Sequence, residues 1–186
     1  ASHLESQLTA QYPESVLVKL PKDYLPAYLA AHPESKVGQI VLGAPFYLPL
    51  RSYKDFKEVD PLSGILGTMS KAGPEDFLLV QIVIAQAGSW QSYGRSLIEK
   101  GIVVDETHSK AHPFAKQIQD KIQMAGYWTG IRLVSSNPQL LANLAGSFGT
   151  FASGEGNYFR FQKPSFLNQK KLLKSISERN FDQVPS

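Results

Sequence analysis

Two histidines, His108 and His112, have the types and spacing that most directly suggest chemistry, and Glu106 lies close by. A separation of four residues places two imidazoles on one side of a helix, where they can share a metal ion with Glu106 as a third ligand. However, Pro113 disfavours helical geometry at His112, and the surrounding segment is polar. We therefore favour a solvated loop and keep a stand-alone enzyme with a site at these residues as an alternative.

Three carboxylates, Asp55, Glu58 and Asp60, form a second candidate group. General acid–base catalysis needs two carboxylates that converge in a cleft, but these three alternate with Lys54 and Lys57. Such alternation is typical of a solvated turn. We expect Asp60 to be the N-cap of the helix that follows, and we expect no catalytic role for the group.

Several catalytic signatures are absent from the sequence. The chain has no cysteine, which excludes disulfides, thiolate metal sites and thiol nucleophiles. It contains neither a GxSxG nucleophile elbow nor a GxxxxGK(S/T) phosphate loop. A glycine cluster late in the chain follows a predicted helix and lacks the phosphate-binding lysine, so an ordinary loop explains it: Gly146, Gly149, Gly154 and Gly156. We expect no catalytic residue and no cofactor.

Composition limits the class of protein. The 186 residues suffice for one ordinary domain or two very small ones. The net charge of +3 is too small to indicate a nucleic-acid or membrane partner by itself. No apolar run approaches the roughly 20 residues of a membrane span, and no signal peptide is visible. The chain begins without a methionine and close to a predicted helix, so we expect a fragment of a longer protein.

Hydrophobic periodicity predicts alternating strands and helices. Strands are predicted at residues 16–20, at 36–42 and 46–50 as one interrupted strand, and at 77–85, 127–134 and 157–161. Helices are predicted at residues 4–11, 24–31, 61–72, 92–100, 114–125 and 138–148. This order predicts an α+β fold of the split βαβ, or ferredoxin-like, type. We expect a mixed or antiparallel sheet with helices mainly on one face.

Changes in composition predict three segments. Residues 1–35 are rich in proline and form an irregular segment or the end of an upstream α/β unit. Residues 36–165 form the main α+β domain. Residues 166–186 are basic, and Leu172, Leu173 and Ile176 lie on one face of a predicted helix. We expect this tail to be a connector outside the core.

Aromatic and basic side chains supply a candidate interaction surface. It comprises Trp90, Tyr93, Arg95, Arg160, Lys170, Lys171 and Lys174. Packing explains the aromatic members well. Because bases stack on aromatic rings and phosphates attract cations, a nucleic-acid-binding module is a second hypothesis.

The most distinctive sequence stretches are three: YLPLRSYKDFKEVDPLSGILGTMSK at 47–71, LLVQIVIA at 78–85 and SWQSYGRSLIEKG at 89–101. Three further stretches accompany them: LESQLTAQYPES at 4–15, GIRLVSSNPQLLANLAGSFGTFAS at 130–153 and SISERNFDQVPS at 175–186. Together they resemble the N-terminal region of conjugative type IV secretion ATPases of the DNA-translocating superfamily. The N-terminal third departs most from that pattern, at PKDYLPAYLAAH.

The resemblance implies a fragment that stops before the nucleotide-binding core. It implies a non-catalytic module in a machine at the cytoplasmic, inner face of the cell membrane. The module would serve oligomerisation or docking. Its partners would be other secretion-complex proteins or a second copy, with weak DNA contact as a further expectation. No catalytic residue can be carried over, because the catalytic residues of the family lie outside this chain.

Overall fold

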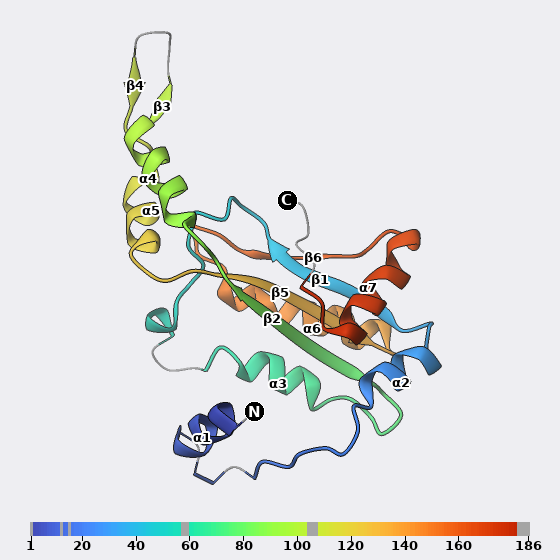
Figure 1. Ribbon diagram of the computed structural model, residues 1–186. Coiled ribbons are helices and arrows are strands. Elements are labelled where there is room, and N and C mark those ends of the chain that lie inside the picture. The colour runs from blue at the N-terminus through green and yellow to red at the C-terminus, as the bar shows by residue number, and fades with distance from the viewer. Residues whose placement is uncertain (1, 12, 15, 57–59, 104–107, 182–186) are drawn as a thin grey trace.

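The computed structural model describes residues 2–11, 13–14, 16–56, 60–103 and 108–181. A four-stranded sheet lies at its centre, with the strand order β2-β5-β1-β6 (Figure 1). The strands are β1 (Lys36–Leu42), β2 (Leu78–Gln86), β5 (Tyr127–Ser135) and β6 (Phe159–Gln162). Every neighbouring pair is antiparallel, and β5 lies between β1 and β2. The predicted α+β fold with an antiparallel sheet is confirmed.

Two helices that connect strands not adjacent in the sheet cover one of its faces. They are α3 (Ser63–Met69), which precedes β2, and α6 (Pro138–Ser147), which precedes β6. Ile40 and Leu133 of the sheet pack against Leu141 and Leu144 of α6 in a buried cluster. Asn137 caps α6, because its side chain accepts hydrogen bonds from two backbone N–H groups of the first turn.

The opposite face is covered in part by α2 (Leu25–Ala31) and α7 (Phe166–Glu178). Leu172, Leu173 and Ile176 of α7 are buried against Val37 and Val134 of the sheet. Hydrophobic periodicity correctly predicts that these three residues share one helix face, but the predicted connector outside the core is wrong. The apolar face instead packs on the sheet, because the antiparallel sheet has a second apolar face that needs cover.

The end of α7 is held by Arg132, which is only 1% exposed. Its Nη1 donates to Gln81 Oε1 at 3.1 Å and to the carbonyl oxygen of Ser175 at 3.3 Å. Its Nη2 donates to the carbonyl oxygen of Asn180. A guanidinium is favourable there because the carbonyl end of a helix carries partial negative charge. Arg132 thus links β5, β2 and the end of α7.

An arm projects from the sheet between β2 and β5 (Figure 1). It consists of α4 (Trp90–Lys100), the short strands β3 (Ile102–Val103) and β4 (Ser109–Lys110), and α5 (Ala115–Ile122). A Cβ at Gly94 would lie 2.6 Å from the Ile122 side chain, so glycine permits the close approach of α4 and α5.

The remaining elements are α1 (Ser2–Gln11) and the 3₁₀ turns η1 (Tyr53–Asp55) and η2 (Phe148–Phe151). Within the described ranges, no helix is long and apolar enough to cross a lipid bilayer. The predicted strand at residues 16–20 is wrong, because these residues are extended but unpaired in the sheet. The second part of the predicted interrupted strand is also wrong: β1 ends at Leu42, and the N–H of Leu48 donates to the carbonyl oxygen of Pro45 in a turn.

The start of α3 also differs from the prediction. Asp60 does not cap the helix directly. Its Oδ1 accepts from the N–H of Leu62 at 2.9 Å, which forms a turn, and α3 begins at Ser63. Ile65 of this segment is buried, whereas Leu62 and Leu66 are exposed.

We expect Arg132→Met to lower the free energy of unfolding by about 2 to 4 kcal/mol. Methionine fills much of the same volume but leaves the Gln81 side chain and the α7 carbonyls without this donor. Urea unfolding is the measurement. The exposed Arg160→Met is the matched control and should stay within about 0.5 kcal/mol of the wild type. Equal effects of both substitutions would contradict the role given to Arg132.

Candidate functional site

The loop at residues 43–50 is held by one buried side chain. Asn157 is fully buried, and its Oδ1 accepts from the N–H of Ala44 at 3.0 Å. Its Nδ2 donates to the carbonyl oxygens of Ala44 at 3.0 Å and Pro45 at 2.9 Å. Its backbone N–H donates to the carbonyl oxygen of Pro49 at 2.7 Å. Because proline has no N–H to donate to a sheet, this loop cannot continue as a regular strand, and Asn157 supplies its hydrogen bonds instead.

A lysine from the arm, Lys121, also donates hydrogen bonds to this loop. Lys121 Nζ, on α5, donates to the carbonyl oxygens of Phe46 and Leu48, the latter at 2.9 Å. Burial lowers the pKa of the Lys121 amine from 10.5 to about 8. Buried Leu48 also packs against Ile118 and Ile122 of α5. The loop and the base of the arm are therefore one packed unit.

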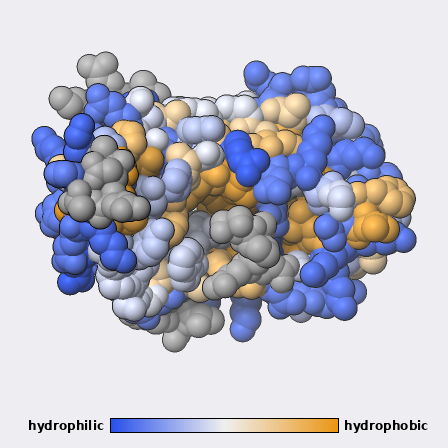
Figure 2. Space-filling model, turned by 90° about the horizontal axis from the view of Figure 1, so that it is seen from above, coloured by the Kyte–Doolittle hydropathy of each residue, from blue (hydrophilic) through white to orange (hydrophobic). Residues whose placement is uncertain are grey.

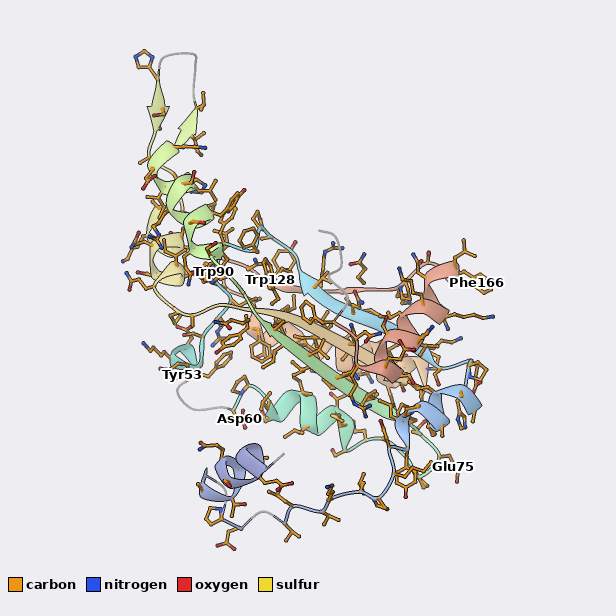
Figure 3. All side chains as sticks on the ribbon, in the orientation of Figure 1. Tyr53, Asp60, Glu75, Trp90, Trp128 and Phe166 are labelled. Carbon is orange, nitrogen blue, oxygen red and sulfur yellow. The ribbon has the colours of Figure 1, made fainter. Side chains whose placement is uncertain are left out.

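This unit presents four aromatic rings, which we call the aromatic surface: Phe46, Tyr47, Tyr93 and Trp128. Phe46 lies at the centre, with ring centroids 5.9 Å from Tyr47, 5.3 Å from Tyr93 and 6.3 Å from Trp128. Tyr93 is 50% exposed and Trp128 is 41% exposed. The rings come from the loop, α4 and β5, and Trp128 is labelled at the base of the arm in Figure 3. Tyr93 and Trp128 therefore contact Phe46 and also remain partly exposed to solvent.

Trp90, a predicted member of the interaction surface, is a packing residue. A Cβ at Gly126 would lie 2.0 Å from Trp90 Nε1, so the indole fits only against a glycine. The ring packs on the cluster of Leu48, Ile118 and Ile122. Its buried Nε1 has no hydrogen-bond acceptor within the described part of the chain. Trp90 thus fixes the base of the arm, while Tyr93, one turn later on α4, faces the aromatic surface.

The predicted basic residues do not converge on this surface. Arg95 is exposed on α4, and Arg160 is exposed on β6, paired with Val41 of β1. The three exposed lysines lie on α7, which is at the other end of the sheet from the arm (Figure 1): Lys170, Lys171 and Lys174. Lys174 lies 3.8 Å from Glu178 in a surface ion pair. The face seen from above shows apolar residues at its centre and a further apolar group at one margin, with hydrophilic residues between and around them (Figure 2).

The candidate metal ligands are not assembled among the described residues, and Glu106 lies outside them. His112 contacts the ring of Tyr47, with centroids 6.0 Å apart, and its Nδ1 accepts from the N–H of Phe114 at 3.2 Å. His108 is exposed beside β4. His112 therefore borders the aromatic surface.

The carboxylate group also has local structural roles. Asp55 Oδ2 accepts from the backbone N–H of Ser52 at 2.6 Å and from its hydroxyl at 3.0 Å. These hydrogen bonds hold the pKa of Asp55 below its ordinary value. Asp60 forms the turn before α3, and Glu58 lies outside the described residues.

Sequence reasoning missed three members of the aromatic surface. The sequence predicts Phe46 and Tyr47 in one strand and Trp128 in another, which gives no reason to group their rings. The flanking Pro45 and Pro49 were the available signal, because two prolines so close together favour a turn that can expose the residues between them.

Comparison of the chain with protein-family models, with curated proteins and with solved structures finds no match. The resemblance to secretion ATPases therefore rests on the sequence stretches alone.

We expect Asn157→Ala to lower the free energy of unfolding by about 2 to 4 kcal/mol, because several buried loop groups lose their partner. Asn157→Asp keeps the acceptor but places a carboxylate against the carbonyl oxygens of Ala44 and Pro45. Its deficit should be at least as large at pH 7 and should shrink at low pH, where the acid is protonated. Urea unfolding at several pH values is the measurement. Asn143→Ala, at an exposed residue, is the control. An Asn157→Ala protein that loses no more stability than this control would contradict the role of Asn157 in holding the loop.

The lowered pKa of Lys121 predicts a stability that rises with pH. Between pH 8 and 10.5 the folded amine is mostly neutral while the unfolded amine still binds a proton, so raising the pH favours folding. This contribution is complete above 10.5 and is lost as the pH falls through 8. The wild type should gain on the order of 1 to 3 kcal/mol relative to Lys121→Met across this window. If the difference in free energy of unfolding between the two proteins does not vary with pH, the Lys121 amine is not desolvated as described.

Proposed function

We propose that this chain is a non-catalytic docking module whose aromatic surface binds another protein. The observation that carries the proposal is a set of four contacting rings, two of them 41–50% exposed, on a loop fixed by Asn157 and Lys121. Aromatic side chains dominate the energetics of protein interfaces. Fixing them in advance reduces the entropy lost on binding.

The chemistry of the described residues supports docking over catalysis. Within those residues no group of three His, Cys, Asp or Glu side chains could hold a metal ion. Asp55 and Asp60, two of the three clustered carboxylates, are hydrogen-bonded in turns. A nucleic-acid partner is the weaker alternative, because the lysines of α7 lie at the far end of the sheet from the aromatic rings.

The resemblance supplies the biological setting of the proposal. The module belongs to a conjugative type IV secretion ATPase at the inner face of the cell membrane, and its partner is another protein of the secretion complex. It contributes no nucleotide site of its own, consistent with a sequence that lacks a phosphate loop. Tight ATP binding by this chain in calorimetry would contradict that assignment.

Site-specific photocrosslinking tests the docking surface. A photoreactive phenylalanine at Tyr93, in cells with a working secretion system, should form an adduct with a secretion protein. The same group at Leu167, which is 85% exposed on α7, should not. Phe46→Ala should remove the adduct at position 93, because it removes the central ring. No adduct at 93, an adduct with DNA, or the same adduct at both positions would contradict the proposal.

A further inference from the structure

Strand β2 forms an edge of the sheet that lacks the usual protection. It stands at one end of the strand order, and its nine residues include no charge and no proline. Ile82 and Ile84 on this strand are 59% and 66% exposed. Natural edge strands generally carry charges, prolines or bulges that prevent pairing with another chain. An uncharged apolar edge of this length therefore indicates a strand partner.

The chain also contains an unpaired segment suited to that edge. Residues 16–20 are extended and lie outside the sheet, below α3 in Figure 1. Val16 is 86% exposed, Val18 is 74% exposed and Leu20 is 64% exposed. Because side chains alternate along an extended chain, these three share one side. Valine-rich apolar segments of this kind favour strands.

The two elements are complementary in an antiparallel arrangement. Val18 opposite Ile82 places Val16 opposite Ile84, so both exposed isoleucines are covered. This register brings Lys22 beside the start of β2, which Glu75 precedes. Lys22 and Glu75 are both exposed and carry opposite charges. The apolar residues are therefore matched in this register, and Glu75 lies three residues before Leu78, the residue opposite Lys22.

We propose that residues 16–20 of one copy pair with β2 of a second copy, and reciprocally, in a two-fold dimer. The segment does not occupy its own β2 edge, which is the arrangement of a donor arm in a strand-swapped dimer. Exchange of this kind continues each sheet by one strand through backbone hydrogen bonds. The inference rests on the proposed role in assembly but uses a surface separate from the aromatic one.

Cysteine crosslinking tests the pairing directly, because the natural chain has no cysteine. Val18→Cys and Ile82→Cys proteins, made separately and mixed, should give a covalent dimer with a short bis-maleimide reagent. Mixing Val18→Cys with Leu167→Cys is the matched control and should give none. A Val18→Cys/Ile82→Cys double variant that crosslinks only within one chain would overturn the proposed exchange. A mixture of the Val18→Cys and Ile82→Cys proteins that forms no covalent dimer would also overturn it.

Light scattering on the full chain gives a second test. The wild type should show twice the 20.5 kDa mass of one chain. Val18→Asp should weaken dimerisation about tenfold or more, because it buries a charge, whereas the control Leu167→Asp, at a residue that is also highly exposed, should not. Phe46→Ala should remain dimeric. A monomeric wild type would overturn this inference and leave the crosslink at Tyr93 as a separate test of docking.

Discussion

The buried amide of Asn157 is the interaction on which the candidate site depends. It satisfies both the N–H of Ala44 and the carbonyl groups of the loop, across 113 residues of sequence. Without such a partner the loop would carry buried polar groups that neither a helix nor a strand satisfies. The turn it stabilises places Phe46 among rings from α4 and β5. A single hydrogen-bonding side chain therefore connects the end of the sheet to the aromatic surface.

The sequence is sufficient to predict elements whose signals are local. The first part of the predicted interrupted strand, residues 36–42, is strand β1, and the helix after Asn137 begins where its cap and Pro138 indicate. The sequence-based predictions are wrong where residues distant in the chain determine the local conformation. Residues 46–50 are apolar enough for a strand, but bonds from Asn157 and Lys121 fold them into a turn.

The wrong prediction that residues 166–186 form a connector has a similar cause. Periodicity identifies the apolar face of α7 but cannot show what that face covers. The surface it packs on is made by β1 and β5, far away in sequence, and Arg132 fixes its end. The aromatic surface is only partly predictable from the sequence, since Tyr93 lies close to a basic residue in the chain, whereas Phe46 and Trp128 come together only through the fold. Local sequence patterns therefore predict the helices and strands, whereas the contacts between these elements determine the aromatic surface.

The central claim is that the Asn157 clamp positions Phe46 against Trp128. The chain has two tryptophans, so their indole N–H signals can be followed separately by nuclear magnetic resonance. Phe46→Ala removes the neighbouring ring and should shift the Trp128 signal. Asn157→Ala should shift it in the same direction, and the double variant should shift it no further. A Trp128 signal that moves in Phe46→Ala but stays at its wild-type position in Asn157→Ala would contradict the account.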